Sequence, residues 1–228
     1  MISQWTIGQS QKVKTEDVFN RYLHTEDEAL AEMIIESEDG LYSLFCQGER
    51  AENAEERIIS FTKFILQNPK YGLAKAYLNR GIEYYQLEQT DSALIDFDKS
   101  IQYDTKETYA YYFRGASNAS LENYDKAIED YSKAIKLKPN FALAYLMRGN
   151  SFYNQKIYEN AIKDYNKVIE LDENADLAYL MRGIVYDAIG EYKKAISDWK
   201  VVKKFKTKNS EHAEKLIEKT NKKLNEKK

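Results

Sequence analysis

A dipeptide that recurs at a fixed interval is the strongest constraint on how this 228-residue chain folds. Arg-Gly occurs four times at steps of 34 residues, and an Ala-Tyr pair that begins four residues earlier keeps the same step. The dipeptides are Arg80-Gly81, Arg114-Gly115, Arg148-Gly149 and Arg182-Gly183. A period held through four copies without an insertion predicts a stack of structural repeats. Such a stack presents a surface, so function is sought first in what that surface binds.

Each copy splits into two segments with helical spacing of apolar residues. In the first copy they cover 74–88 and 91–103, and the other copies follow at steps of 34 residues. The links are short, which predicts an antiparallel helix pair. Small residues at Gly81 and Ala93 indicate a close approach of the two helices, with the recurring aromatic residues filling the space between neighbouring pairs. The sequence therefore predicts an all-α chain.

Outside the repeats the chain has two different ends. We expect these segments: 1–25, an N-terminal arm with a short helix from Thr15; 26–70, an acidic helical cap ending in a degenerate half-repeat; 71–207, the four repeats; and 208–228, a basic C-terminal capping helix. Thr25 to Glu28 has the pattern of a capping box. Asn140, Asn174 and Ser210 are expected N-caps of later helices.

The repeated pattern resembles the tetratricopeptide repeat (TPR) family. In copy one it reads Tyr77-x2-Arg80-Gly81-x2-aromatic, then Ala93-x3-Phe97, and the resemblance covers residues 74–207. It implies a right-handed superhelical solenoid of antiparallel helix pairs that binds other proteins. The chain departs from the family where tyrosine stands for tryptophan, arginine for leucine, and the proline after the second helix occurs only at Pro139.

The resemblance also implies that the first helix of each repeat lines a concave binding groove. The groove positions are Lys75, Leu78, Asn79 and Ile82 in copy one, Tyr109, Tyr112 and Phe113 in copy two, Leu143, Leu146, Met147 and Asn150 in copy three, and Leu177, Leu180, Met181 and Ile184 in copy four. These residues are mainly apolar, which favours an amphipathic helix or an extended apolar peptide as the partner. They differ from the Lys, Arg and Asn set with which some family members clamp carboxylate tails of chaperones. Alternatively, neighbouring helices bury these side chains, or the N-terminal segment fills the groove.

Four aspartates keep the same period as the arginines. The two sets are Arg80, Arg114, Arg148 and Arg182, and Asp96, Asp130, Asp164 and Asp198. We favour a structural ladder in which each arginine pairs with the aspartate of its own repeat. In the other interpretation, the arginines bind an acidic or phosphorylated partner.

Composition argues against several classes of function. The net charge is −3 and is uneven, reaching +7 over residues 191–228. This basic end is read as a solvated cap, with an acidic or RNA partner as the alternative. Cys46 stands alone in an apolar helical pattern, and His24 and His212 lie far apart, so no catalytic residue, metal site or cofactor is expected. No apolar run approaches the ~20 residues of a membrane helix, and a cytoplasmic location is expected.

The leading functional hypothesis is therefore a non-enzymatic protein-binding module with an apolar groove, of which chaperone-like and immunity-like proteins are special cases. A structural protein that self-associates is the second class. Weak binding of nucleic acid or an acidic partner through the Lys-rich end is the third. No membrane partner is expected, and the sequence does not name the protein partner.

Overall fold

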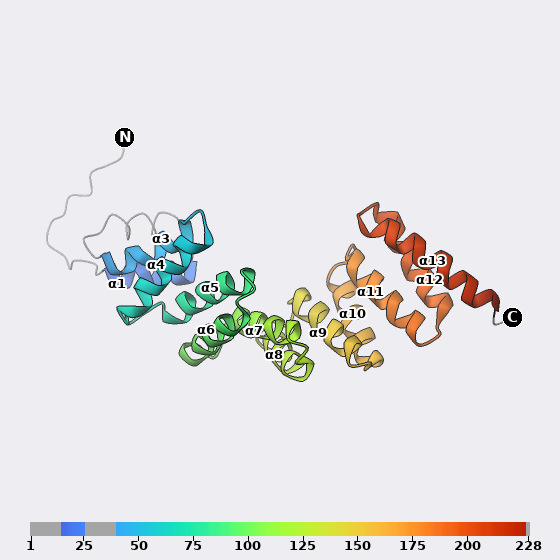
Figure 1. Cartoon of the computed structure of the whole chain (residues 1–228), viewed down its shortest axis with the longest axis horizontal. Helices are drawn as coiled ribbons and strands as arrows, with labels where there is room; N and C mark the ends of the chain where they lie inside the picture. The colour runs from blue at the N-terminus through green and yellow to red at the C-terminus, as the bar shows by residue number, and fades with distance from the viewer. Residues whose placement is uncertain (1–14, 26–39, 227–228) are drawn as a thin grey trace. The chain divides into compact units, whose positions relative to one another are not determined.

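The computed structural model describes residues 15–25 and 40–226, and every element in these ranges is a helix (Figure 1). The chain divides into two compact units between Thr105 and Lys106. The helices of the first unit are α1 (Thr15–Thr25), α3 (Gly40–Arg50), α4 (Ala54–Leu66), α5 (Leu73–Gln86) and α6 (Thr90–Tyr103). The helices of the second unit are α7 (Thr108–Ser120), α8 (Tyr124–Leu137), α9 (Ala142–Asn154), α10 (Tyr158–Leu171), α11 (Asp176–Ala188), α12 (Tyr192–Phe205) and α13 (Asn209–Glu226).

The predicted helix pairs of the repeats are present. The pair predicted at 74–88 and 91–103 is α5 and α6, with ends within two residues of the prediction. The predicted N-terminal helix from Thr15 is α1. The expected arm over residues 1–14, the capping-box residues after Thr25 and the first part of the expected acidic cap, residues 26–39, lie outside the described residues.

The core of the first unit is aromatic. Phe19 of α1 is fully buried, and its ring centroid lies 4.4 Å from that of Tyr42 and 5.3 Å from that of Phe45, both on α3. Phe61 and Phe64 of α4 complete the cluster. Cys46 lies in the same cluster with 1 % of its surface exposed, in keeping with a packing role. The N-terminal helices thus have their own hydrophobic core.

In the second unit each helix packs on the next, from α7 to α13. The last helix contacts the preceding pair through apolar residues. Ala213 is fully buried against Trp199 and Val202 of α12, and Leu216 and Ile217 pack at the edge of this cluster. Thr220 is 1 % exposed, and its hydroxyl donates to Asp187 Oδ1 on α11 at 2.9 Å. Helix α13 therefore packs on both helices of the fourth repeat.

One glycine in each repeat lies against the aromatic residue of the second helix. A Cβ atom added to Gly149 would lie 2.8 Å from Cε1 of Tyr165, and one added to Gly183 would lie 2.4 Å from Nε1 of Trp199. Gly48 of α3 lies against Phe61 in the same way, at 2.9 Å. Helices α3 and α4 therefore pack on each other with the same glycine–aromatic contact as the repeats. The sequence reading missed it because only 13 residues separate this glycine from its aromatic partner, against 16 in the later copies.

Substituting Gly149 by alanine is expected to lower the free energy of unfolding by about 1–2 kcal/mol. Overpacking against Tyr165 costs about 1–3 kcal/mol, and the better helix propensity of alanine returns somewhat less than 1 kcal/mol. Gly40→Ala is the control, because no atom of the described residues lies within 4 Å of its Cβ position. Urea unfolding followed by circular dichroism measures both variants, and equal stability of the two would contradict the close approach.

The predicted N-caps are wrong. Helix α9 begins after Phe141 and α11 after Ala175, and no side-chain hydrogen bond caps either helix. Tight backbone turns supply the bonds instead: the amide of Ala142 donates to the carbonyl of Asn140 at 3.0 Å, and that of Asp176 donates to the carbonyl of Asn174 at 2.8 Å.

Ser210 is also misplaced by the prediction. It lies inside the first turn of α13, and its hydroxyl donates to the carbonyl of Val202 at 3.2 Å. Thr207 Oγ1 accepts the hydrogen bond from the amide of Asn209 at 3.3 Å. The serine thus fastens α13 to α12, and the capping acceptor lies three residues earlier in the chain.

Candidate functional site

The first helices of copies two to four, α7, α9 and α11, are neighbours in the second unit. Tyr109, Leu143 and Leu177 occupy the same repeat position on these helices, and they are 43 %, 53 % and 38 % exposed. Four residues further along each helix lie the half-buried side chains of Phe113, Met147 and Met181. We call these six residues the helix-A face. The structure therefore brings together large apolar side chains from three successive repeats.

Other predicted groove residues frame the helix-A face. Asn150 Oδ1 accepts a hydrogen bond from the hydroxyl of Tyr165 at 2.7 Å, which ties this polar side chain to α10. Tyr112 packs its ring against Phe113 and Phe141, with centroids 5.1 and 5.0 Å apart. Ile184 is half-buried beside the Trp199 cluster. These three residues support the face more than they extend it.

Three leucines assigned to the groove are core residues. Leu78, Leu146 and Leu180 are 4 %, 6 % and 6 % exposed. Leu146 packs in the cluster around Tyr165, and Leu180 packs in the cluster around Trp199. They share one repeat position that points between helices, so they have almost no surface to offer a partner.

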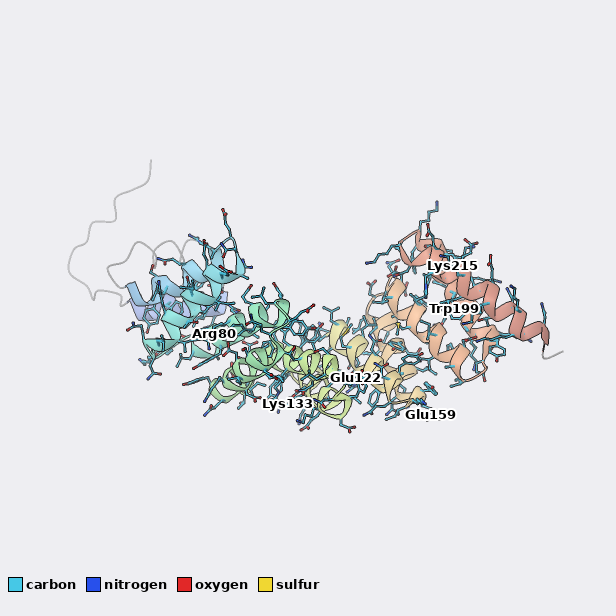
Figure 2. The ribbon with its side chains drawn as sticks, in the orientation of Figure 1. Arg80, Glu122, Lys133, Glu159, Trp199 and Lys215 are labelled. Carbon is cyan, nitrogen blue, oxygen red and sulfur yellow. The ribbon has the colours of Figure 1, made fainter. Side chains whose placement is uncertain are left out.

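The four Arg–Asp pairs are present and bidentate. In each, Nε and Nη2 of the guanidinium donate to the two oxygens of the aspartate from the second helix of the same repeat (Figure 2 labels Arg80). The Nε···Oδ2 distances are 2.7 Å for Arg80–Asp96, 2.9 Å for Arg114–Asp130, 2.8 Å for Arg148–Asp164 and 2.8 Å for Arg182–Asp198. The aspartates are 2–6 % exposed. The paired donors of each guanidinium therefore join the two helices of one repeat.

The arginines make two further kinds of contact, a hydrogen bond to the preceding repeat and a cation–π contact. Nη1 of Arg148 donates to Ser132 Oγ at 2.9 Å, and Nη1 of Arg182 donates to Asn166 Oδ1 at 2.5 Å, so the guanidinium also contacts the second helix of the preceding repeat. The guanidinium carbon of Arg148 lies 5.5 Å from the ring centroid of Tyr145. Arginine and tyrosine thus replace the leucine and tryptophan of the family pattern together, as a cation–π pair.

Burial sets the electrostatic character of these pairs. It raises the pKa of the Asp164 carboxyl, against the lowering effect of the hydrogen bond and charge of Arg148. For Arg182, burial lowers the pKa, and the hydrogen bond and charge of Asp198 more than offset this, so that the pKa is raised. Part of the attraction within each pair therefore compensates the loss of water around it.

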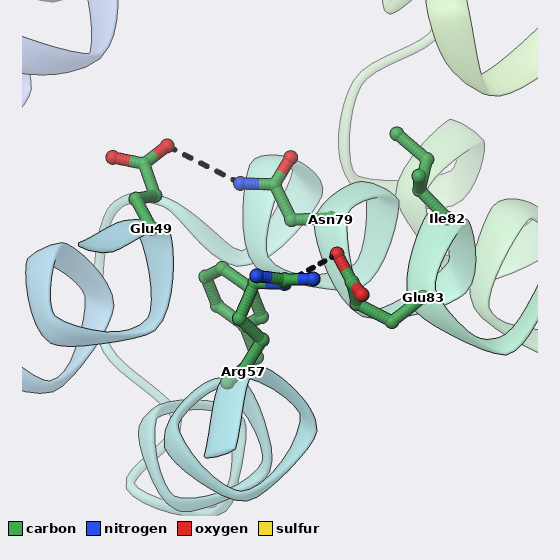
Figure 3. Close-up of a pocket in the computed structure, with 6 residues that line it drawn as sticks. Glu49, Arg57, Asn79, Ile82 and Glu83 are labelled. Carbon is green, nitrogen blue, oxygen red and sulfur yellow. Dashed lines mark hydrogen bonds and ion pairs between the residues drawn. The ribbon is translucent and has the colours of Figure 1, made fainter. Parts of the chain in front are cut away.

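The groove residues of copy one belong to the first unit and have a different environment. Lys75 is half-buried, and Asn79 and Ile82 line a pocket of about 260 Å³ with Glu49, Arg57, Phe61 and Glu83 (Figure 3). Asn79 Nδ2 donates to Glu49 Oε1 at 3.2 Å, and Arg57 Nε lies 2.8 Å from Glu83 Oε1. This polar pocket was not predicted, because its ion pair joins α4 to α5 outside the repeated pattern.

The Lys-rich end of the chain is partly neutralised by carboxylates. Lys223 Nζ lies 2.5 Å from Asp187 Oδ2, and Lys203 Nζ lies 2.5 Å from Glu214 Oε1. These contacts hold α13 on α11 and α12. They favour the interpretation of this end as a cap over the alternative of a nucleic-acid surface.

Two searches for other kinds of site gave negative results within the described ranges. No group of three or more His, Cys, Asp or Glu side chains in residues 15–25 and 40–226 is placed to hold a metal ion. Among the helices that the structure describes, none combines the length and apolar character needed to cross a membrane.

An all-α array of helix pairs with one variable, partly exposed face defines a repeat-type interaction protein. Family models for the tetratricopeptide repeat match residues 74–107 and 142–175, and a TPR repeat model matches residues 117–156. The chain is a tetratricopeptide repeat protein of the all-α solenoid class, as the sequence predicted, and it is a protein–protein interaction module. None of the curated proteins matches the sequence.

Solved structures of TPR proteins share the fold. A crystal structure of MamA has a TM-score of 0.68 and 21 % identity, and the match covers 77 % of this chain and 96 % of that one. YrrB, described as a TPR protein with an unusual peptide-binding site, has a TM-score of 0.63 and 18 % identity over 89 % of this chain and 100 % of its own. The first TPR of Spaghetti, bound to an HSP90 peptide, has a TM-score of 0.50 and 23 % identity over 53 % and 95 %. At these identities the likeness concerns the fold alone.

Proposed function

We propose that the second unit binds an apolar helix or extended peptide of a partner protein on its helix-A face. The observation that carries this proposal is the placement of Tyr109, Leu143 and Leu177, three large apolar side chains exposed at one repeat position on neighbouring helices. Single exposed apolar residues are common on proteins, whereas an aligned set on adjacent helices is typical of an interaction surface. The six side chains would contact the apolar stripe of the partner.

The chemistry of the face favours an adaptable apolar contact. Met147 and Met181 have flexible, polarisable side chains that fit more than one apolar shape. An amphipathic helix offers anchors at positions i, i+3 or i+4 and i+7 to such a groove. A carboxylate-tail clamp is not favoured, because the positions equivalent to Asn79 in copies two and three are Phe113 and Met147.

Peptide binding by two structural neighbours supports the proposal at the level of the class. YrrB is described with a peptide-binding site, and the Spaghetti domain is seen with a bound peptide. Chaperone-like and immunity-like proteins are two forms in which such a face would act. The identity of a captured partner would separate them.

The double variant Phe113→Asp/Met147→Asp is expected to lose the partner. Two carboxylates on the face would have to be buried unpaired in the complex, which costs far more than the apolar contacts contribute. The measurement is affinity purification with quantitative mass spectrometry, followed by calorimetric titration of the captured protein. We expect the dissociation constant to rise by about 100-fold or more.

The matched control is Leu121→Asp/Ile157→Asp, which changes two exposed apolar residues of the same unit in the turns between helices. It is expected to retain the partner. Because Phe113 and Met147 are half-buried, Leu143→Asp/Leu177→Asp repeats the test at more exposed positions, with circular dichroism to verify folding. If all three variants recover the same partner with equal affinity, the assignment of the helix-A face is wrong.

Self-association is the competing function. Size-exclusion chromatography with light scattering distinguishes it, because a stable oligomer that dissociates on Leu143→Asp/Leu177→Asp would place a second copy of this chain on the face. A monomer at micromolar concentration is the result expected from the proposal.

A further inference from the structure

Helix α13 occupies the place that the first helix of a fifth repeat would have, one residue out of register with the 34-residue period. Ala213 and Thr220 are buried, and they stand 35 residues after Ala178 and Val185, the buried residues at the equivalent places of α11. Like the first helices before it, α13 packs on the preceding second helix, α12 (Figure 1). The extra residue explains why a fixed period did not connect α13 with the repeats.

The same register continues the helix-A face onto α13. His212 stands 35 residues after Leu177 and is exposed, as that leucine is. Leu216 stands 35 residues after Met181 and is half-buried, and it packs against the same cluster as Ile184 of α11. The face therefore has a fourth helix, on which histidine takes the position held by large apolar residues in the three repeats.

The charged side chains of α13 are divided between two faces of the helix. His212, Leu216, Lys219 and Lys223 follow one another at steps of four, three and four residues, so they share one stripe. The carboxylates of α13 between these residues lie on a different face, since their steps of three and four residues begin one residue earlier, at Glu211, Glu214 and Glu218. From His212 to Lys223, the stripe that continues the helix-A face thus carries basic side chains and no acidic ones.

Two of these basic side chains are available to a partner. Lys223 is held by Asp187 of α11 at 2.5 Å. His212 and Lys219 are exposed, and neither forms an ion pair with a carboxylate of residues 15–25 and 40–226. Asp176, the other carboxylate of α11, already accepts hydrogen bonds from two side chains at the α12–α13 junction. The chain itself therefore does not neutralise this end of the face.

The rest of the helix-A face offers no comparable charge. The charged residues of α7, α9 and α11 are the ladder arginines and the two aspartates of α11. At the other end of the face, the Lys138 ammonium lies 5.3 Å from the ring centroid of Tyr109 and 5.1 Å from that of Phe141, so the chain's own rings hold it. The face is thus apolar over three helices and basic on the fourth.

We propose that the partner segment carries an aspartate or glutamate beyond its apolar anchors, and that this carboxylate binds His212 and Lys219 on α13. The Lys219 ammonium and a ring N–H of His212 donate to the carboxylate oxygens. The inference rests on the proposed function and extends its face by one helix. Packed helices lie about 8–10 Å apart, so in a helical partner the carboxylate stands about six or seven residues beyond the anchor that contacts α11. The acidic end gives the bound segment one direction.

Selection of peptides from a phage-displayed library of random 20-residue segments on the immobilised full-length protein tests the proposal. We expect the selected peptides to share apolar residues at helical spacing, with aspartate or glutamate about six or seven residues beyond the last of them. One selected peptide is then synthesised with its acidic residue and with the neutral amide in that place. Calorimetric titration is expected to give a dissociation constant about fivefold higher for the amide peptide.

Reversing one charge of the protein gives the matched test. Lys219→Glu is expected to raise the dissociation constant of the acidic peptide about tenfold, because it replaces an attraction by a repulsion. A peptide with lysine in place of its acidic residue should regain affinity for this variant. Lys200→Glu makes the same change of charge at an exposed residue of α12 and is expected to have no effect. His212→Glu should weaken the acidic peptide in the same direction as Lys219→Glu.

Three results would overturn the proposal: selected peptides without an acidic residue at this spacing, equal affinity of the acidic and amide peptides, or unchanged affinity in both Lys219→Glu and His212→Glu. A single-stranded RNA oligonucleotide whose binding is lost in Lys219→Glu, while peptide binding is kept, would assign these cations to nucleic acid instead.

The same peptides separate the two proposals. Peptides that bind Phe113→Asp/Met147→Asp as tightly as the wild type show that the proposed function has failed. Peptides that are lost in that variant, yet are indifferent to Lys219→Glu, show that only the basic end has been wrongly assigned. A library without any saturable binder overturns both.

Discussion

Trp199→Ala is expected to lower the free energy of unfolding by about 3–5 kcal/mol, the usual cost of truncating a large buried aromatic side chain. Trp199, labelled in Figure 2, has no exposed surface, and it packs in one cluster with Leu180, Val202 and Ala213. Its indole N–H donates to the carbonyl of Leu180 at 3.1 Å. The substitution removes this hydrogen bond and opens a cavity where α11, α12 and α13 meet, so part of the loss comes from a weaker hold on α13.

Two further variants give the control. Tyr109→Ala truncates an aromatic residue that is 43 % exposed, and it should change stability by less than about 1 kcal/mol. Trp199→Phe should fall between the two, because Phe97 fills the equivalent position in copy one. Chemical unfolding of all three variants is followed by far-ultraviolet circular dichroism. Tryptophan fluorescence is not a suitable probe, because two of the variants remove Trp199. A loss no larger than that of Tyr109→Ala would refute the assignment of Trp199 to the core.

The second large effect is expected at the arginine ladder. Arg148→Leu leaves the Asp164 carboxylate, which is 4 % exposed, without its two guanidinium donors. We expect a loss of about 3 kcal/mol in the free energy of unfolding, the low end of the range for a broken buried pair. The low end applies because the Arg148 side chain is 19 % exposed and already draws part of its stabilisation from water.

The double variant Arg148→Leu/Asp164→Ala distinguishes a stabilising pair from a broken one. Because burial opposes the ionised form of Asp164, removing both charges should restore most of the stability lost in Arg148→Leu. Chemical unfolding of the wild type, both single variants and the double variant closes a mutant cycle. A double variant less stable than Arg148→Leu would show that the two side chains act independently. If Arg148→Leu lost the partner without losing stability, the arginines would be binding residues, and the structural ladder would be wrong.

The repeats could be predicted because the residue pairs that make their contacts recur four times in the sequence. Gly149 against Tyr165, and Arg148 against Asp164, are each separated by 16 residues, so a single period describes them all. The helix pairs and the Arg–Asp ladder both follow from local spacing. The Gly48–Phe61 contact has the same geometry with a shorter separation, and a fixed period cannot detect it.

What the sequence did not predict depends on packing between elements. The resemblance to the family placed Leu146 and Leu180 in the groove, yet both side chains face a neighbouring helix and are buried. Asn140 has the side chain of a good cap, but backbone bonds in the turn already satisfy the first amides of α9. Arg57 and Glu83 are unremarkable charges in sequence, and only the contact of α4 with α5 makes them a pair.

The Nη1 atoms of the arginines, which donate to the preceding repeat, bear on how a chain of this kind can gain or lose repeats. Arg148 contacts Ser132, and Arg182 contacts Asn166, at equivalent places of the preceding repeat. Excision of residues 141–174 as one block would bring Arg182 to Ser132, an acceptor that already serves an arginine in the same geometry. The contact between consecutive repeats is therefore interchangeable. Whole copies can be gained or lost without new side chains at the new contact.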